Sequence, residues 1–410
     1  MNTWFAATTL LVAAALAACG SAGEAPVQPS ADAGVPGADA SADGGVSPVP
    51  VVVVEGDYTW SIPAGFRKPV VPGDNPMSKA KVDLGRHLFY DKRLSENRTQ
   101  SCGSCHEQKR AFTDGRARGL GSTGQLHPRG SMALANVGFA TRLTWANDLI
   151  DSLEEQALLP LFGETPVELG FAGREDELLR RLQDDASYPA KFAASFPGEA
   201  NPISVKNIVR AIACFERTLI SGNSAYDRFA YGIDSTALSD AAQRGKDLFF
   251  SERLECFHCH GGFAFADSVT HEGKTIVESA FHNTGLYNLD GQGAYPQDNR
   301  GLMEVSGKPS DMGRFRAPSL RNIALTAPYM HDGSIQTLEE VLDTYARGGR
   351  LIASGPNAGD GAKSPLRSEF VRGFALSEGE RADVVAFLKS LTDDAFLSNP
   401  AHADPFAPSP

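Results

Sequence analysis

The chain has 410 residues, of which 50 are acidic and 38 are basic, and its formal net charge is −12. This length is sufficient for two domains with sizeable hydrophobic cores. The excess of acidic residues argues against a nucleic-acid partner, which would require a basic face.

The N-terminal segment is predicted to export and tether the protein. Residues 1–18 form a short apolar run that ends in small residues, as in a secretory signal peptide. The sequence LAAC at 16–19 is similar to a bacterial lipobox and predicts acylation of Cys19. An ordinary signal peptide is the alternative, because no Lys or Arg precedes the apolar run. Residues 19–56 are rich in Ala, Gly, Pro, Ser and Asp and are predicted to be a disordered lipoprotein tether. We therefore expect a periplasmic protein, or one anchored to the outer membrane, that contacts lipid only through this anchor.

Two copies of the motif C-x-x-C-H carry the strongest chemical signal in the chain. This motif attaches c-type haem: two thiols bind the vinyl groups of one porphyrin, and the next imidazole is the proximal iron ligand. A zinc site would use both cysteine pairs together or a distant pair of histidines. Here the pairs lie far apart, and each has its own adjacent His, so we expect two covalent c-type haems. The motif residues are Cys102, Cys105 and His106 in the first copy and Cys256, Cys259 and His260 in the second.

The segments before the two motifs repeat each other. LGRHLFYDKRL at 84–94 and RGKDLFFSERL at 244–254 share Gly, Leu-Phe-aromatic and Arg-Leu positions in register. Apolar residues at helical spacing predict that a helix packs on each haem. The fold is therefore expected to be mainly α, with two tandem cytochrome-c-like domains, and Ser239 is the expected N-cap of a helix in the second. The predicted ranges are 1–18 for the signal peptide, 19–56 for the tether, 57–235 for the N-terminal haem domain, 236–396 for the C-terminal haem domain and 397–410 for a tail.

Three long segments carry a resemblance to a known family. They are AKVDLGRHLFYDKRLSENRTQSCGSCH, DSLEEQALLPLFGETPVELG and FRAPSLRNIALTAPYMHDGSIQTLEEVLDTYARGG, and with shorter matches they span about residues 58–393. The chain resembles the bacterial dihaem cytochrome c peroxidase/MauG superfamily, and within it the MbnH-like dihaem enzymes. The resemblance implies a haem-dependent oxidoreductase that acts on peroxide, with its active region at the interface of the two haem domains.

The sixth ligand of the second haem distinguishes the branches of this superfamily. The peroxidases have Met at this position and the MauG-type enzymes have Tyr, and the resemblance places Tyr345 there. A thioether is a soft ligand that raises the haem potential, whereas a phenolate is a hard anionic donor that favours higher oxidation states. A half-buried core aromatic is the alternative role for Tyr345. The competing ligands are Met330, His331, His282 and His271.

The resemblance also implies a reactive pocket at the first haem, whose proximal ligand is His106. The peroxidases carry a distal His in the loop after the motif. The only His there is His127, which we interpret as a loop residue, so the first haem is expected to be five-coordinate and open to peroxide. The MauG pattern places Gln156, Pro160 and Glu168 over the open iron. A carboxylate can take the proton of peroxide and return it to the departing oxygen, so Glu168 is the expected general acid–base.

Two further features of the superfamily concern the region between the haems. The resemblance places Trp145 there as an electronic bridge; a packing role is the alternative. It also implies a calcium ion held by the carbonyls of Thr326 and Pro328. Gly130 occupies the position of the expected Asn ligand, which weakens that site. Leu254 stands where MauG has the Trp that relays oxidising equivalents to its partner, so the sequence does not indicate the exit route to a partner.

These expectations favour one function over two alternatives. In the favoured function, hydrogen peroxide drives both haems to a high-valent bis-Fe(IV) state that oxidises a residue on a partner protein. Resemblance to MbnH implies that this residue is a tryptophan of a secreted, MbnP-like copper-binding protein, converted to kynurenine. One alternative is a dihaem cytochrome c peroxidase that takes electrons from a small cytochrome, which Tyr345 and the missing distal His disfavour. The other is an electron-transfer cytochrome without catalysis, which the open first haem disfavours.

Overall fold

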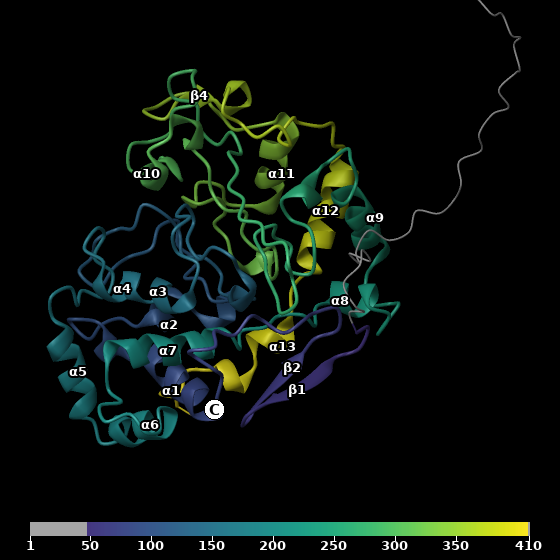
Figure 1. The fold of residues 1–410 in the computed structure, drawn as a ribbon. Helices are drawn as coiled ribbons and strands as arrows, with labels where there is room; N and C mark the ends of the chain where they lie inside the picture. Colours follow the sequence, from purple (N-terminus) through teal and green to yellow (C-terminus); the bar gives the residue numbers. More distant parts are fainter. Residues whose placement is uncertain (1–46, 409–410) are drawn as a thin grey trace, which may run out of the picture. The chain divides into compact units, whose positions relative to one another are not determined.

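The computed structural model describes residues 47–408, which lie in one compact unit. The predicted signal peptide, Cys19 and most of the predicted tether lie outside these residues. The unit is mainly helical, as expected, with two small two-stranded sheets (Figure 1). None of the helices in this described part has the length and apolar character needed to span a bilayer. The helices are α1 Lys79–Tyr90, α2 Cys102–Cys105, α3 Leu153–Gln156, α4 Leu158–Phe162, α5 Glu175–Gln183, α6 Tyr188–Ser195, α7 Val205–Glu216, α8 Ala225–Ala230, α9 Asp240–Phe249, α10 Met303–Ser306, α11 Leu338–Arg347, α12 Glu378–Lys389 and α13 Asp394–Leu397; the strands are β1 Val51–Glu55, β2 Tyr58–Ile62, β3 Leu351–Ile352 and β4 Gly359–Asp360.

Serine caps begin the four long helices that support the haem motifs. Ser78 begins α1, Ser204 begins α7 and Ser377 begins α12, and each hydroxyl accepts a hydrogen bond from an N–H of the first turn. Ser239 caps α9 in the same way through the N–H of Ala242, which confirms the predicted N-cap. These caps satisfy N–H groups that have no partner within the helix.

The repeated glycine of the two flanking segments has a structural cause. In α1, a Cβ atom on Gly85 would lie 1.9 Å from the carbonyl oxygen of Ala211 in α7. In α9, a Cβ atom on Gly245 would lie 1.9 Å from the carbonyl oxygen of Asp383 in α12. Each haem motif, together with its helix pair and core, is called a module here. In each module the backbones of the two helices approach so closely that only Gly fits at the contact.

Two hydrophobic cores accompany the two haem motifs. The first includes Phe89 of α1 and Phe215 of α7. The second includes Phe249 of α9 and Phe387 of α12. Phe396 of α13 belongs to the first core although it is close to the C-terminus, and in Figure 1 the end of the chain returns to the region of α1. The last helix, α13, therefore packs on the core of the first haem motif, although it follows the second motif in the sequence.

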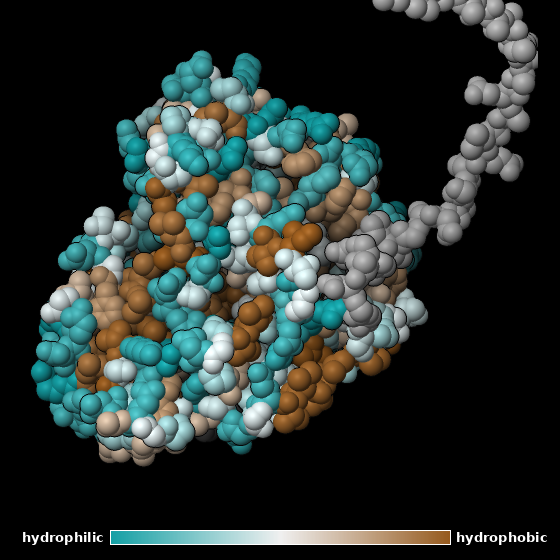
Figure 2. All heavy atoms as spheres, in the orientation of Figure 1, coloured by the Kyte–Doolittle hydropathy of each residue, from teal (hydrophilic) through white to brown (hydrophobic). Residues whose placement is uncertain are grey.

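Residues 51–62 form an antiparallel hairpin of β1 and β2. The predicted disordered tether, 19–56, is wrong at its C-terminal end, because Val51–Glu55 forms strand β1. Four consecutive valines have high β propensity, and Trp60 on β2 anchors the hairpin in the interior with 1% of its surface exposed. Val52 and Val54 remain exposed, and apolar surface is visible at the place of this hairpin in Figure 2.

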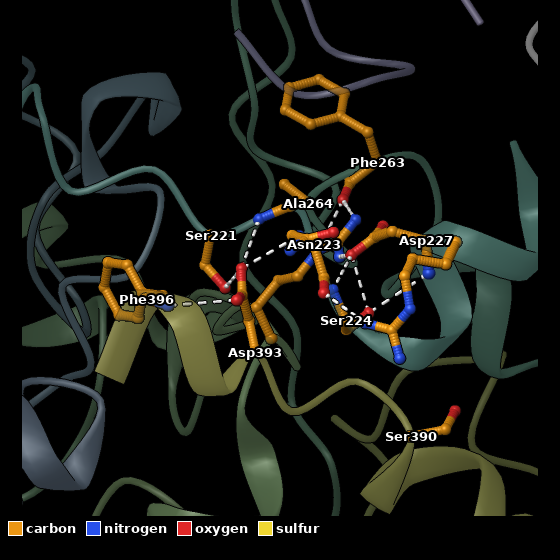
Figure 3. Close-up of polar contacts among 12 residues, drawn as sticks. Ser221, Asn223, Ser224, Asp227, Phe263, Ala264, Ser390, Asp393 and Phe396 are labelled. Carbon is orange, nitrogen blue, oxygen red and sulfur yellow. Dashed lines mark hydrogen bonds and ion pairs between the residues drawn. The ribbon is translucent and has the colours of Figure 1, made fainter. Parts of the chain in front are cut away.

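A buried polar cluster joins segments that are distant in sequence (Figure 3). The Asp393 carboxylate accepts hydrogen bonds from the N–H of Gly222 at 3.0 Å and the N–H of Asn223 at 2.9 Å. Next to it, Arg321 forms an ion pair of 2.5 Å with Asp227, and both side chains are fully buried. Buried charges of this kind are tolerated only when they are paired and hydrogen-bonded. The cluster therefore fastens the loop before α8 to the segment before α13.

The close approach of α9 and α12 can be tested by adding one methyl group. Gly245→Ala should lower the free energy of unfolding by about 1–3 kcal/mol, the usual cost of overpacking, because the Asp383 carbonyl would have to move. Gly379→Ala, in α12 with open space around its Cβ position, is the matched control and should not destabilise the protein. Urea denaturation of the haem-loaded variants measures both, and equal stability of the two variants would contradict the close approach.

Candidate functional site

Both C-x-x-C-H motifs fold as a single helical turn. The first motif forms α2, and the N–H of His106 donates to the carbonyl of Cys102 at 3.0 Å. The second forms a 3₁₀ turn over Cys256–His258, and the N–H of His260 donates to the carbonyl of Cys256 at 2.9 Å. The motif cysteines are half-buried. Each turn therefore presents two thiols and one imidazole, and they come from the same three positions of the motif in both copies.

The two motif histidines are oriented by the same kind of hydrogen bond. Nδ1 of His106 lies 2.8 Å from the carbonyl oxygen of Phe112, and Nδ1 of His260 lies 3.2 Å from that of Phe265. A carbonyl can only accept, so Nδ1 carries the proton in both rings. Nε2 then keeps its lone pair for a metal, which is the arrangement that metal-binding histidines usually show.

The carbonyls that orient these histidines belong to two phenylalanines in an unusual conformation. Phe112 has a φ of 64° and Phe265 has a φ of 50°. Bulky residues rarely adopt this left-handed region, and such residues are concentrated at functional sites. The same local conformation thus follows both motifs. The sequence repeat gave no sign of it, because it lies after the motifs and not before them.

A cavity of about 420 Å³ lies beside the first motif and is lined by Cys102, Cys105 and His106. The structure brings Gln156, Pro160 and Glu168 to the same cavity. Backbone hydrogen bonds hold the loop that carries Glu168: its carbonyl accepts from the N–H of Ser122 at 2.7 Å, and the N–H of Leu169 donates to the carbonyl of Pro160 at 2.9 Å. Burial raises the pKa of Glu168 to about 7. The cavity thus contains a carboxyl group that can exist in either protonation state near neutral pH.

His127 also lines this cavity, but the Nδ1 atom of His127 accepts a hydrogen bond, whereas that of His106 donates one. The donor to His127 is the N–H of Arg129, at 3.0 Å. Burial lowers the pKa of His127 to about 4, so the ring is neutral at pH 7 and its single proton lies on Nε2. Neither ring nitrogen then has a free lone pair, which agrees with the interpretation of His127 as a loop residue and not a ligand.

The cavity contains a second carboxyl group, which no sequence motif indicates. Glu216, at the end of α7, lines it, and burial raises its pKa to about 8. Its Oε2 atom has no hydrogen-bond partner. The adjacent Arg217 pairs instead with Glu154, Nη2 to Oε2 at 2.8 Å. Only the tertiary fold shows which of these acids faces the cavity.

A second cavity, of about 180 Å³, is lined by Cys256, Cys259 and His260 of the second motif. Tyr345 of α11 lines it as well, and burial raises the pKa of its phenol. The phenol is therefore protonated in the protein without metal, and a bound cation would lower its pKa. The structure thus brings Tyr345 to the same cavity as His260.

Three of the four competing ligands also reach this cavity. Met330, His331 and His282 line it, whereas His271 does not. His282 is occupied, because its Nε2 lies 2.5 Å from a carboxylate oxygen of Asp267. His331 stacks on Phe315 with ring centroids 3.6 Å apart, and its buried Nε2 has no hydrogen-bond partner. Tyr345, His331 and Met330 are therefore the candidates that an experiment must separate.

The second cavity also contains a buried cation, which no sequence motif indicates. Arg316 lines it, and burial lowers its pKa to about 10. Its guanidinium donates to the carbonyl of Thr144 at 3.3 Å and to the sulfur of Met132 at 3.3 Å. In the described part of the chain no carboxylate forms an ion pair with it. An unpaired buried cation suits a haem propionate, so Arg316 would bind this group.

Trp145 lines both cavities. Its indole Nε1–H donates to the carbonyl of Gly130 at 2.8 Å, and its own carbonyl accepts from the N–H of Arg316 at 2.8 Å. The N–H of Gly130 in turn donates to the carbonyl of His331 at 2.9 Å. The first bond holds the indole ring, and the two backbone bonds hold Trp145 and Gly130 against the segments that carry Arg316 and His331.

Each module combines a C-x-x-C-H turn, an imidazole with a free Nε2 and an adjacent cavity. This arrangement fits a covalently bound c-type haem in each module and defines the protein as a dihaem c-type cytochrome.

The comparisons with known proteins narrow this class to one family. A family model named di-haem cytochrome c peroxidase matches residues 79–235, and a RoxA-like, cytochrome c-like model matches residues 314–350. The methylamine utilization protein MauG of Methylorubrum extorquens is 33% identical over 336 residues, which cover 81% of this chain and 84% of that protein. The cytochrome-c peroxidase IdrP1 of Pseudomonas sp. is 34% identical over 355 residues, covering 82% of this chain and 86% of that protein. A solved structure of a MauG-like protein associated with microbial copper homeostasis is 51% identical, with a TM-score of 0.83, and covers 85% of this chain and 100% of that chain.

The chain therefore belongs to the di-haem cytochrome c peroxidase/MauG family. It is a haem-dependent oxidoreductase that uses peroxide and carries two c-type haems. The family resemblance of the sequence is thereby confirmed.

Proposed function

We propose that this protein is an MbnH/MauG-like enzyme that uses peroxide to oxidise a residue of a partner protein. The observation that carries the proposal is the position of Trp145, which lines the cavities of both haem motifs. An oxidisable indole at this position supports joint use of the two haems, with the active region where the haem domains meet.

Proton transfer is the contribution of the first cavity. The haems, when bound, supply the reaction with peroxide and hold the two oxidising equivalents. Glu168 in its charged form takes the proton of peroxide, and its protonated form then returns that proton to the departing oxygen. Its pKa of about 7 makes both forms available near neutral pH. Gln156 offers an amide for hydrogen bonds to peroxide, and the ring of Pro160 excludes water from the same cavity.

Electron transfer is the contribution of Trp145 and the second cavity. His260 and Tyr345 are the proposed protein ligands of the second iron, where an anionic oxygen would stabilise the oxidised state. Trp145 loses an electron towards the first cavity and regains one from the second, so that both sites share the oxidation. Its indole is the most easily oxidised type of side chain available for this step.

The partner is proposed from the relatives. The MauG-like relative that is 51% identical is associated with microbial copper homeostasis, which supports a secreted, MbnP-like copper-binding partner with a tryptophan that is converted to kynurenine. Reduction of peroxide by a small cytochrome is the second candidate, favoured by the 34% identity to a cytochrome-c peroxidase. Incubation with peroxide and each partner separates them: a mass change on the copper protein supports the first function, and oxidation of a reduced cytochrome supports the second.

A lipid anchor and a calcium ion are also part of the proposal. A lipid at Cys19 would hold the enzyme on a membrane that faces an exported compartment. A calcium ion would use the carbonyls of Thr326 and Pro328. Gly130 adds no side-chain oxygen to such a site, and its carbonyl already accepts the indole N–H of Trp145.

Glu168→Gln tests the proton transfer. The reaction with peroxide should slow by about 10²–10⁴, the usual contribution of general acid–base catalysis. In the unchanged protein this rate should rise as the pH increases through about 7, because only the charged carboxylate accepts a proton; the variant should lose this dependence. Stopped-flow absorbance measures both. Glu155→Gln, which replaces an exposed acid on the same helix as Gln156, is the control, and wild-type kinetics in Glu168→Gln would remove Glu168 from the mechanism.

Tyr345→Phe tests the ligand of the second haem. Loss of the phenol oxygen should convert the low-spin electron paramagnetic resonance signal of the ferric protein into a second high-spin signal. His331→Gln is the matched variant, because the buried Nε2 of His331 has no hydrogen-bond partner and His331 lines this cavity. The opposite result, a low-spin signal that survives in Tyr345→Phe and is lost in His331→Gln, would reassign the ligand.

Trp145→Phe tests the joint use of the haems. The variant keeps a ring of similar shape but is much harder to oxidise, so it should retain both haems and react with peroxide yet fail to oxidise the partner protein. Haem content, stopped-flow spectra and the mass of the partner are the measurements. Partner oxidation at the wild-type rate would show that Trp145 has only a packing role.

A further inference from the structure

A chain of aromatic rings leads away from Trp145 on the side of the second cavity. The ring of His331 lies 6.5 Å from that of Trp145, measured between centroids. Tyr295 lies 6.3 Å from His331, and Tyr287 lies 5.4 Å from Tyr295. Every step is a contact between adjacent rings, and the chain ends in two tyrosines, Tyr295 and Tyr287. It is a path along which an electron can move towards the haem pair.

The last tyrosine of this chain has a proton acceptor. The hydroxyl of Tyr287 donates to Oδ2 of Asp332 at 2.6 Å. No Lys or Arg in the described part of the chain forms an ion pair with Asp332, and its Oδ1 accepts a second hydrogen bond, of 3.1 Å from the N–H of Ser334. Tyr295 differs, because its hydroxyl donates to the amide oxygen of Asn283 at 2.9 Å, and an amide is not a base. Oxidation of a phenol at neutral pH requires release of its proton, which only Tyr287 can achieve through its hydrogen bond.

We propose that Tyr287 and Asp332 form a redox-active pair that takes up an oxidising equivalent from the peroxide-treated enzyme. Tyr287 gives one electron through Tyr295, His331 and Trp145 and reduces the oxidised haem pair by one equivalent. Its O–H bond breaks, the proton moves to Oδ2 of Asp332, and a neutral tyrosyl radical remains. The inference rests on the peroxide chemistry of the family and not on the identity of the partner protein.

The burial of the pair indicates that it stores the equivalent inside the protein. Tyr287 is 6% exposed and Tyr295 is 4% exposed, so neither ring is presented to a docked protein. Met330 lines the second cavity and carries a thioether that oxidation converts to sulfoxide. An internal tyrosine that takes up the equivalent first would protect such side chains when no partner is bound.

The chain offers a matched control for this pair. Tyr188 also donates to a carboxylate oxygen at 2.6 Å, that of Asp91, and it is 1% exposed. It lies in the first core, next to Phe192, and is not part of the aromatic chain from Trp145. Asp91 is also paired with Arg93 at 2.8 Å, so its charge is already compensated. The hydrogen bond is the same in both pairs, but the position relative to the haem cavities is not.

The test is electron paramagnetic resonance of the haem-loaded protein frozen after mixing with hydrogen peroxide and no partner, with deuterated tyrosine to identify the radical. We expect a tyrosyl signal in the unchanged protein and in Tyr188→Phe. Tyr287→Phe should lose it, and Asp332→Asn should lose it although Tyr287 is still present. Peptide mapping of Tyr287→Phe should show more sulfoxide at Met330. The rate of the first reaction of the ferric protein with peroxide should be unchanged in all variants.

Three outcomes would overturn the proposal: no tyrosyl signal in the unchanged protein despite consumption of peroxide, a signal that persists in Tyr287→Phe, or a loss in Tyr188→Phe equal to that in Tyr287→Phe. Failure of the unchanged protein to react with peroxide would instead contradict the function itself. The two failures are therefore distinguishable in one experiment.

Discussion

The buried ion pair between Arg321 and Asp227 is the interaction on which the second haem module depends. Both side chains are fully buried, and removal of one partner from such a pair costs about 3–5 kcal/mol because the other charge is left uncompensated. Arg321 also donates from Nε to the carbonyl of Phe263 at 2.8 Å. Two residues later, the carbonyl of Phe265 orients His260. The same guanidinium that closes the core therefore holds the loop that aims the proximal imidazole, and fold and cofactor geometry have a common origin.

The two modules share their helix packing and the orientation of their motif histidines, but their cavities are lined by different chemical groups. Gly85 and Gly245 allow equivalent helix pairs to approach, and Phe112 and Phe265 orient the two imidazoles from equivalent left-handed conformations. The cavities differ. The first is larger and contains acids whose pKa is raised into the neutral range by burial, whereas the second is lined by Tyr345, His331, Phe315 and the unpaired cation Arg316. The first cavity thus offers carboxyl groups for the proposed proton transfer, and the second offers the phenol of Tyr345 as the proposed iron ligand.

Local sequence patterns were sufficient for those parts of the molecule whose causes are local. Ser239 could be predicted as an N-cap because capping depends on a few consecutive residues, and the motif spacing fixes which thiols and imidazoles face one haem. The predictions failed or were silent where distant segments meet. Val51–Glu55 forms a strand only by pairing with β2, and Phe396 joins a core built from residues far earlier in the chain. Glu216 lines the first cavity, whereas Glu154 forms an ion pair with Arg217. The local sequence does not distinguish these two acids, because tertiary packing decides which of them faces the cavity.

The contrast between Trp145 and Tyr287 shows how a hydrogen-bond acceptor can decide the fate of an oxidising equivalent. The indole N–H of Trp145 donates to the carbonyl of Gly130, which is too weak a base to remove the proton. An electron lost from this indole therefore leaves a cation that can be reduced again without proton movement, as a bridge between two haems requires. The phenol of Tyr287 donates to the carboxylate of Asp332, which can keep the proton and so stabilise the neutral radical. In the proposed scheme one acceptor makes a reversible relay and the other a reservoir, although both rings belong to the same aromatic chain.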